Sequence, residues 1–376
     1  MDLVLSTEEA MLRETMARFI EREYSFEARK RRLALPDGFS RETWKGLADL
    51  GVLAAALPTD LGGFGAGPMG TLIIAQACGA GLVLEPYLSS IVLGAGLLEL
   101  AGTPEHLDLL QRATGGEALL AFAHSEPSAR DDVEPVSMRA VETSAGYSLS
   151  GAKSFVLHGG VADQLIVSAR AGGAGDEAAV SLFVVDRLAP GVGVRNYRTV
   201  DGLQAADVTL DGVSLPRQAL LGEQGHARAV IEHVIDRGNA ALCAEATGAM
   251  QCLLEKTVAY LRTRLQFGQP LARFQALQHR VADMAMHVEQ ARSMAYLAAQ
   301  QVDRADVAAR RRWISAAKAR VCMAAGFVGK QAIQLHGGIG MTDALDVSHY
   351  FRRLTSISHT LGDEAWHLEL FATTSA

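Results

Sequence analysis

The chain has 376 residues, of which 49% are hydrophobic and 20% charged, and it carries a formal net charge of −7. This length is too great for one small core and suits one large enzyme body or two to three subdomains. The acidic balance argues against a general nucleic-acid binder, because phosphate contacts need a basic surface.

Residues 6 to about 114 follow a helical pattern. The segment "STEEAMLRETMARFIEREY" opens with Ser6 or Thr7 followed by acidic residues, which is typical of a capped helix start. Apolar residues then recur at helical spacing. A second helical pattern, "FSRETWKGLADLGVLAAALP", stops at a proline, and the glycine-rich "DLGGFGAGPMG" after it predicts a loop.

Neither the N-terminus nor the cysteines indicate export. The first residues include acids and lack the basic and apolar regions of a signal peptide. The most apolar segment, "LSSIVLGAGLLELAG", is interrupted by Glu99 and is too short to span a bilayer. The four cysteines form no Cys-x-x-Cys pair. Three of them, Cys243, Cys252 and Cys322, lie in apolar, helix-like segments, where buried free thiols are the simplest interpretation. We therefore expect a cytoplasmic protein without a membrane span.

The pattern changes to short β-rich runs from about Leu119 to Leu221. "GYSLSGAKSFVLHGGVADQLIVSARA" and "EAAVSLFVVD" are separated by turn residues, and "ADVTLDGVSLPRQALLG" alternates apolar and polar positions. These runs predict an antiparallel β domain. Helical patterns return from about Gly225 to the end, so the order of the predicted regions is α–β–α.

Two segments in the C-terminal part carry more information. In "RTRLQFGQPLARFQALQHRVADM", residues 262–284, a Gly-Gln-Pro turn places Arg264 at the end of one helix and Gln275 at the start of the next. In "QLHGGIGM", residues 334–341, three glycines end a helix, and glycine lets a phosphate or another backbone approach closely. Taken alone, both segments also fit plain structural roles, such as helix-dipole partner for Arg264 and packing for Phe267.

In combination, these motifs resemble the acyl-CoA dehydrogenase family. "RxQFGxPLxxFQxxQ" is followed by "QxxGGxGM", and they are preceded in the family's order by "LADLGVLAAALPTDLGGFG", "HSEPSARD", "LSGAKSFVLHGG" and "LPRQALLGEQGHA". The resemblance implies an α+β fold with an N-terminal α-helical domain, a middle antiparallel β-barrel and a C-terminal four-helix bundle. The corresponding predicted domains are residues 1–117, 118–224 and 225–376.

The resemblance also implies FAD as the cofactor. In the family, FAD lies between the barrel and the bundle, and its adenine end reaches into the neighbouring subunit. By that correspondence, Arg264 would pair with the pyrophosphate, because a guanidinium is an always-charged fork of donors, and Phe267 would pack on the adenosine part. The other residues predicted to contact FAD from this end of the chain are Gln275, Gln334, Gly337 and Gly338. These residues would serve the FAD of a partner subunit.

The family's reaction is α,β-desaturation of an acyl-CoA thioester, in which a carboxylate removes the α-proton and a hydride passes to flavin N5. In most members the base is the glutamate of a Tyr-Glu-Gly-Thr-like stretch, which aligns with Leu361. In a minority the base lies on the helix before the QFG motif, at the position of Gly238. Neither residue is a carboxylate, so the candidates for a displaced base are Asp236 and, in the tail, Asp363 or Glu364.

The residues expected around the flavin ring are altered as well. By the resemblance, the family threonine that meets flavin N5 corresponds to Leu157, and the stacking tryptophan to Phe155, whereas Ser125 keeps a hydroxyl. The motifs that the family donates across the interface are thus kept, and those for a chain's own flavin and substrate are lost. This pattern resembles the small-subunit branch of bacterial hetero-oligomeric acyl-CoA dehydrogenases, which degrade dicarboxylic and steroid acyl-CoAs.

Two functions are compatible with these patterns. The favoured one is a base-lacking, cofactor-clamping subunit of a hetero-oligomer, a dimer or tetramer assembled through the C-terminal bundle, whose longer homologous partner supplies the base. The alternative is a self-sufficient homo-oligomeric dehydrogenase with a displaced carboxylate. Both imply an acyl-CoA substrate, an electron-transfer acceptor protein, and a role in fatty acid or steroid side-chain degradation. No metal site is expected, because the C-terminal histidines match no ligand spacing: His349, His359 and His367.

Overall fold

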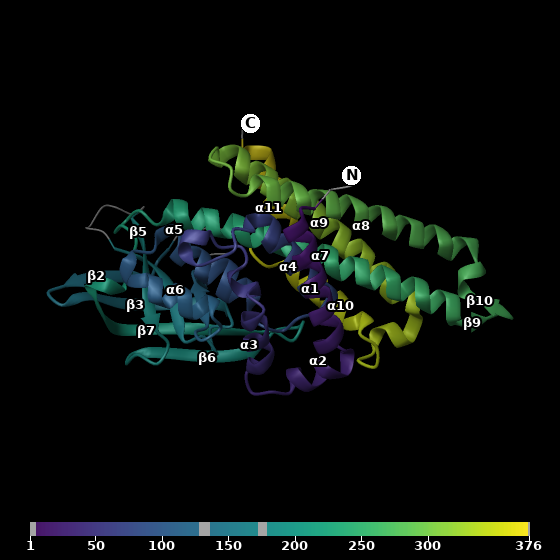
Figure 1. Cartoon of the computed structure of the whole chain (residues 1–376), viewed down its shortest axis with the longest axis horizontal. Coiled ribbons are helices and arrows are strands. Elements are labelled where there is room, and N and C mark those ends of the chain that lie inside the picture. Colours follow the sequence, from purple (N-terminus) through teal and green to yellow (C-terminus); the bar gives the residue numbers. More distant parts are fainter. Residues whose placement is uncertain (1–4, 128–135, 172–178, 375–376) are drawn as a thin grey trace. The chain divides into compact units, whose positions relative to one another are not determined.

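The computed structural model describes residues 5–127, 136–171 and 179–374 (Figure 1). The chain divides into two compact units. The helical unit comprises Met1–Arg31, Pro68–Val83 and Asn239–Ala376, and the sheet unit comprises Arg32–Gly67 and Leu84–Gly238. Helices from the N-terminal part of the chain therefore contribute to both units.

The N-terminal part of the chain is helical, as predicted. Its α-helices are α1 (Thr7–Glu23), α2 (Phe26–Leu33), α3 (Arg41–Asp49), α4 (Gly67–Gly81), α5 (Gly96–Ala101) and α6 (Leu107–Thr114). The Ser6 hydroxyl accepts from the Glu9 N–H at 3.1 Å, and the Glu9 carboxylate accepts from the Ser6 N–H at 2.8 Å. The predicted cap is thus confirmed as a capping box, which satisfies two backbone donors at the start of α1.

The most apolar segment forms a buried π-helix in the sheet unit. This helix, η3 (Tyr87–Ala95), spans nine residues, and all of them except Leu88 are buried. The hydroxyl of Ser90 accepts from the backbone N–H of Leu120 at 3.0 Å and so joins η3 to the first strand. Burial within the unit explains the apolar composition, because each large apolar side chain removed from water stabilises the fold by about 1.5–3 kcal/mol.

One eight-stranded sheet dominates the sheet unit, with the order β6-β7-β3-β2-β4-β5-β8 and with β1 paired to β4. Figure 1 labels β2, β3, β5, β6 and β7 of this sheet. The strands are β1 (Leu120–Ala123), β2 (Arg139–Thr143), β3 (Gly146–Leu157), β4 (Gln164–Arg170), β5 (Val180–Asp186), β6 (Val192–Arg198), β7 (Gln204–Pro216) and β8 (Leu220–Leu221). Most pairs are antiparallel, as predicted, but β1 and β2 both run parallel to β4. All four residues of β1 are buried, so its sequence lacks the alternation that marks a strand with one wet face.

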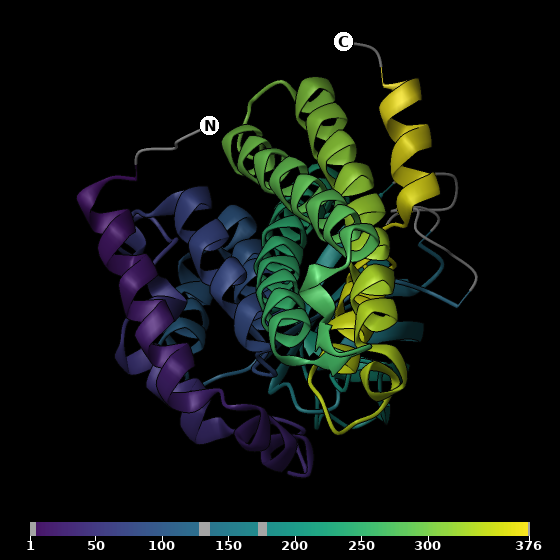
Figure 2. The ribbon, with the colours of Figure 1, turned by 90° about the vertical axis from the view of Figure 1, so that its right-hand side faces the viewer.

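The C-terminal part of the helical unit consists of long α-helices, again as predicted. They are α7 (Arg228–Thr263), α8 (Gln275–Gln301), α9 (Val307–His336), α10 (Val347–Ile357) and α11 (Glu364–Thr373). A hairpin of β9 (Leu265–Gln266) and β10 (Gln269–Pro270) follows α7, and the 3-10 helix η7 (Gly337–Met341) follows α9. Helix α9 packs against α8, α10 and α11, and Figure 2 shows α8 and α9 running side by side.

Helices α4 and α7 approach each other closely through two glycines. A Cβ built on Gly79 would lie 1.9 Å from the carbonyl oxygen of Glu245, and one built on Gly248 would lie 1.9 Å from that of Gln76. Any side chain at these positions would force the helices apart. The Gln76 amide also donates to the Thr247 hydroxyl at 3.1 Å, so the contact includes a polar bond.

The cysteines are free thiols, as expected: Cys78, Cys243 and Cys322 are buried, and Cys252 is partly buried. Burial raises the pKa of Cys243 to about 12, which keeps this thiol protonated and unreactive near neutral pH. Within the described ranges, no helix combines the length and apolar character that crossing a membrane requires.

Candidate cofactor-binding site and base positions

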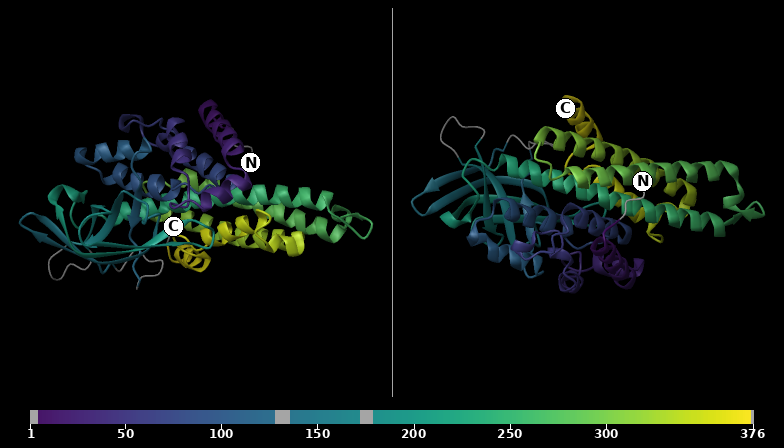
Figure 3. Two further views of the ribbon diagram at one scale, coloured as in Figure 1. Left: turned by 90° about the horizontal axis from the view of Figure 1, so that it is seen from below. Right: turned by 45° about the horizontal axis from the view of Figure 1, so that its top comes forward.

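The hairpin between α7 and α8 carries the first motif (Figure 3). The N–H of Arg264 donates to the carbonyl of Tyr260 at 2.8 Å, and the carbonyl of Arg264 accepts from Leu271 at 2.9 Å. Phe267 occupies the turn at φ 54°, a conformation that costs a non-glycine residue free energy, and its side chain is 90% exposed. The ring meets that of Phe274 edge to face, with centroids 6.0 Å apart, and its largely exposed surface leaves an apolar face open to a ligand.

The second motif lies at the end of α9, beside the end of α7. The Tyr260 hydroxyl donates to the His336 carbonyl at 3.3 Å, and the two rings stack with centroids 4.4 Å apart. Gly337 then turns the chain at φ 66°. A Cβ built on Gly337 or Gly338 would meet no atom within 4 Å. The structure thus brings the motif of Arg264 and the glycine motif to the same end of the helical unit and leaves the glycine backbone open.

The two glutamines predicted to contact the cofactor, Gln275 and Gln334, are both exposed. Gln275 begins α8, and Gln334 lies in the last turn of α9. The guanidinium of Arg280 donates to the side chain of Gln331 at 3.3 Å, which ties α8 to α9 near these positions. The glutamine side chains are therefore placed by two helices that are joined to each other, rather than by a loop.

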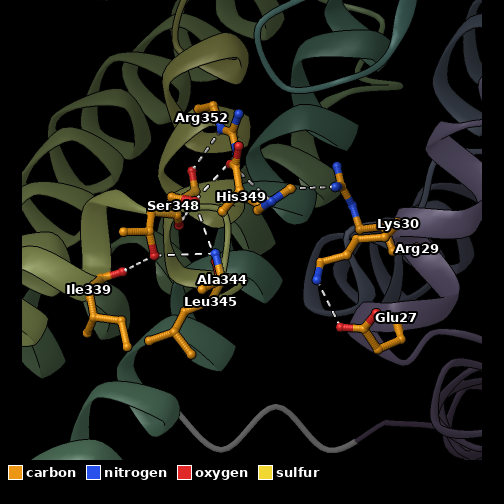
Figure 4. Close-up of polar contacts among 11 residues, drawn as sticks. Glu27, Arg29, Lys30, Ile339, Ala344, Leu345, Ser348, His349 and Arg352 are labelled. Carbon is orange, nitrogen blue, oxygen red and sulfur yellow. Dashed lines mark hydrogen bonds and ion pairs between the residues drawn. The ribbon is translucent and has the colours of Figure 1, made fainter.

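Helix α10 holds the loop that follows the glycines (Figure 4). The Ser348 hydroxyl donates to the carbonyl of Thr342 at 2.9 Å, and the Thr342 hydroxyl donates to that of Ile339 at 2.8 Å. Arg352 forms an ion pair with Asp343 at 2.5 Å. These contacts join both ends of the loop to one helix and so limit the motion of the glycine backbone.

His349 connects this loop region to α2 (Figure 4). Nη1 of Arg29 donates to Nδ1 of His349 at 2.7 Å, and an arginine can only donate, so the histidine proton lies on Nε2, 3.5 Å from Asp343. Burial and the charges of Arg29 and Arg352 lower the pKa of His349 to about 4. The ring is neutral near pH 7 and serves as an acceptor between two helices, not as a catalytic acid.

The groups at this end of the helical unit fit a phosphate-bearing nucleotide such as FAD. Within the described residues, the guanidinium of Arg264 has no carboxylate partner, which leaves its donors for a phosphate. The uncovered ring of Phe267 suits an adenine, and the open backbone at Gly337 and Gly338 suits close approach of a cofactor. The residue types present thus fit the cofactor that the sequence predicts.

The remaining predicted cofactor contacts lie together in the sheet unit. Ser125 is exposed, and its carbonyl accepts from the N–H of Ser154 at 2.8 Å. Phe155 adopts φ 52° and is 42% exposed, and Leu157 is partly exposed at the end of β3. One backbone bond therefore holds the segment of Ser125 beside the strand that carries the other two residues.

A buried ion pair connects the same two segments. Nζ of Lys153 lies 2.7 Å from the Glu126 carboxylate, and both side chains are at most 1% exposed. Lys153 also donates to the His124 carbonyl and to the Ser168 hydroxyl, both at 3.0 Å, while Glu126 accepts from the N–H of Ser137 at 2.8 Å. Burial lowers the pKa of Lys153 to about 8, and Glu126 opposes that shift, so both groups are charged near pH 7.

Neither predicted base position holds a carboxylate, and a buried lysine bonds to a sequence neighbour of each. Lys318, on α9, is 0% exposed. Its ammonium donates to the Thr360 carbonyl at 2.5 Å and to Oδ1 of Asn239 at 3.1 Å. Thr360 immediately precedes Leu361, and Asn239 immediately follows Gly238. One ammonium group therefore bonds to residues adjacent in sequence to both predicted base positions.

The turn at Leu361 has an unusual backbone and a second buried donor. Leu361 and Gly362 have φ of 58° and 101°. Nε2 of His367 lies 3.0 Å from the Leu361 carbonyl, and Nδ1 lies 3.3 Å from the Ser315 hydroxyl. A carbonyl only accepts, so Nε2 carries the proton. Burial, together with the charge of Lys318, lowers the pKa of His367 to about 3, which keeps the ring neutral.

The three candidate acids occupy different environments. The Asp363 carboxylate accepts from the Trp366 N–H at 2.9 Å and caps α11. Glu364, in the first turn of α11, is exposed and lines a cavity of ≈ 360 Å³ between α9 and α11. Asp236 is buried on α7. It precedes Gly238 by two residues, which is about 200° around a helix, so its side chain points to another side.

Sequence analysis missed Lys318 and the pair of Glu126 and Lys153. A signal for Lys318 was present, because it lies at helical spacing from Ile314 and Cys322 in the apolar stretch "WISAAKARVCMAA". A lysine on an apolar stripe indicates a buried ammonium that needs acceptors. No sequence pattern indicated its acceptors, Asn239 and the carbonyl of Thr360, because both lie far from Lys318 along the chain.

Comparison with known proteins shows which proteins the chain is similar to. Family models of the acyl-CoA dehydrogenase N-terminal, middle and C-terminal domains match residues 6–115, 121–213 and 225–375. The probable acyl-CoA dehydrogenase YngJ of Bacillus subtilis is 29% identical over 94% of this chain and 93% of its own length.

The chain is also similar to several solved structures over nearly its whole length. The ChsE4–ChsE5 complex of Mycobacterium tuberculosis matches with a TM-score of 0.88 and 26% identity over 100% of both chains. A variant of the Tcur3481–Tcur3483 steroid ACAD matches with a TM-score of 0.87 and 28% identity over 97% of this chain and 96% of the other. The FAD complex of PigA matches with a TM-score of 0.89 and 25% identity, over 99% of this chain and 98% of the other.

The family models together cover most of the described sequence, and the fold has the expected N-terminal helices, middle sheet domain and C-terminal helices. The chain belongs to the FAD-dependent acyl-CoA dehydrogenase family of oxidoreductases.

Proposed function

We propose that this chain is a base-lacking subunit of a hetero-oligomeric acyl-CoA dehydrogenase. The observation that carries the proposal lies at the base positions, where Leu361 and Gly238 offer no carboxylate and Asp363 is engaged in capping α11. A longer homologous subunit would supply the base. The two-chain ChsE4–ChsE5 complex supports this organisation, since it shares the fold over the whole chain.

In such an assembly, the exposed end of the helical unit would hold the adenosine and pyrophosphate part of FAD, bound by the partner subunit. The residues with this role are Arg264, Phe267, Gln275, Gln334, Gly337 and Gly338. FAD supplies the hydride acceptor for α,β-desaturation of the acyl-CoA thioester. In the sheet unit, the side chain of Leu157 cannot donate a hydrogen bond to a flavin, whereas Ser125 retains a hydroxyl and Phe155 an aromatic ring.

The substrate of the assembly would be an acyl-CoA from steroid side-chain or fatty acid degradation. The similarity to the Tcur3481–Tcur3483 steroid ACAD supports a steroid acyl chain. Subunits would assemble as a dimer or tetramer through the C-terminal helices. An electron-transfer acceptor protein would reoxidise the flavin, and the assembly would operate in the cytoplasm.

A second function is a self-sufficient homo-oligomeric dehydrogenase with a displaced base. The observation that favours it is the burial of Asp236, which is 7% exposed on the helix where a minority of the family carries the base. A buried carboxylate on that helix is the best-placed alternative acid in this chain, but its direction about the helix differs from that of position 238.

The test is to purify the chain alone and after co-expression with a longer homologue, and to record visible spectra and acyl-CoA-dependent bleaching. We expect the chain alone to be colourless or inactive, and the pair to be yellow and active. Asp236→Asn should leave the activity of the pair unchanged, whereas substituting the partner's base should abolish it.

Two results would overturn this proposal in favour of the second function. One is flavin bleaching by acyl-CoA with the chain alone. The other is loss of that activity in Asp236→Asn, with the flavin still bound.

A further inference from the structure

Two buried donors hold the turn at position 361 by its backbone carbonyls. Lys318 donates to the carbonyl of Thr360 at 2.5 Å, and His367 donates to the next carbonyl, that of Leu361, at 3.0 Å. A Cβ built on Gly362 would lie 2.7 Å from Nε2 of His367, so the turn is packed closely against this ring. Such contacts fix both the position and the left-handed conformation of Leu361.

The ammonium of Lys318 is also close to position 361 itself. The carbonyl oxygen of Thr360 and Cα of Leu361 belong to one planar peptide, so Nζ lies within about 5 Å of that Cα. A positive charge at such a distance from an acid lowers its pKa by about one to three units. Lys318 therefore acts on the electrostatic potential at this position as well as on its geometry.

Other charged groups face the same region. Asp363 and Glu364, on α11, raise the pKa of Cys322 on α9, whereas Lys318 lowers it, and burial is the largest cause of the raised value. Asp363 directs its carboxylate to the N–H of Trp366 at the N-terminus of α11, where the helix dipole offsets part of its charge. His367 is neutral. The ammonium of Lys318, in contrast, is hydrogen-bonded directly to the peptide that joins Thr360 to Leu361.

We propose that Lys318 is a positioning residue that fixes the Thr360–Gly362 turn and makes position 361 electropositive, a preformed site for a carboxylate that this chain does not carry. This inference rests on the assignment of position 361 in the proposed function. A glutamate placed at this position would be kept ionised and oriented by the same lysine; in this chain, the lysine and the turn surround Leu361.

A thiol placed at position 361 tests the proposal without flavin or turnover. In Leu361→Cys, the rate of alkylation against pH gives the pKa of the new thiol. The native cysteines contribute little background, since burial raises the pKa of all four: Cys78, Cys243, Cys252 and Cys322. The matched reference is Leu188→Cys in the sheet unit, at a position that is 77% exposed.

We expect the thiol at 361 to have a pKa at least about one unit below that of the reference, although partial burial acts in the opposite direction. Adding Lys318→Met should remove this lowering. A thiol at 361 with a pKa equal to or above the reference would overturn the proposal.

The comparison with Leu188→Cys uses intact Lys318, so it decides the question even if Lys318→Met does not fold. Because neither measurement involves activity, failure here would leave the base-lacking function untouched, and a self-sufficient enzyme could still show the expected thiol pKa.

Discussion

Arg353 on α10 donates to both carboxylate oxygens of Glu245 on α7, at 2.6 and 2.7 Å, and both side chains are largely buried. The bidentate geometry gives each charge its partner away from water. This pair joins the helix before the Leu361 turn to the long helix that carries Asn239, and so helps to hold the two segments that contain the predicted base positions.

Removing one charge of this pair should be costly. We predict that Glu245→Gln destabilises the protein by about 3–5 kcal/mol, because the guanidinium loses its buried counter-charge. Denaturant unfolding measures the loss. The matched control is Glu289→Gln, which breaks an exposed pair with Arg292 and should cost less than about 1 kcal/mol. Equal costs for the two variants would contradict the assigned role of burial.

Glycine substitutions should distinguish close helix contact from helix propensity. Gly79→Ala should destabilise the protein by about 1–3 kcal/mol or more, because its Cβ would overlap a carbonyl of α7. Gly326→Ala, in the middle of α9 with no atom within 4 Å of the new Cβ, should stabilise it by about 0.5–1 kcal/mol. Thermal unfolding of both variants gives the comparison, and a stabilising Gly79→Ala would refute the contact.

Loss of the guanidinium at position 264 should weaken FAD retention by the assembly. We expect Arg264→Ala to raise the Kd for FAD about tenfold or more, since a charge-assisted hydrogen bond contributes about 1.5–3 kcal/mol. The control is Arg292→Ala, an exposed arginine of α8 paired with Glu289. Flavin fluorescence during titration measures both. An unchanged Kd in Arg264→Ala would show that the clamp is assigned wrongly.

His367 should make stability depend on pH. Its pKa is about 3 in the folded chain and about 6.5 when unfolded, so the unfolded state binds a proton first as the pH falls. Stability should therefore be complete above about pH 6.5 and decline toward pH 3, by about 2 kcal/mol between pH 7 and 5. His367→Gln cannot take up this proton and should show a flatter profile.

The control for this prediction is His359→Gln, which changes an exposed histidine of the same segment. Its profile of unfolding free energy against pH should follow that of the parent protein. A profile for His367→Gln that is as steep as the parent's would contradict the prediction.

Local features of the fold could be predicted from the sequence because they depend on neighbouring residues. The capping box at Ser6 and Glu9 needs only a four-residue pattern, and the chain reversal at Gly337 needs only a glycine that tolerates positive φ. The alternating runs of the middle region likewise predicted strands. The all-buried β1 was harder, because four apolar residues in a row do not show which strand they pair with or in which direction.

At the predicted base positions, the sequence alone determined which chemistry is missing: the side chains of Leu361 and Gly238 cannot remove a proton, whatever the fold does. Only the tertiary structure decided which groups lie around these segments of the chain. Lys318 lies far along the chain from both Asn239 and Thr360, and no local propensity links them. They meet because a buried ammonium must find acceptors, and helix packing offers it these two.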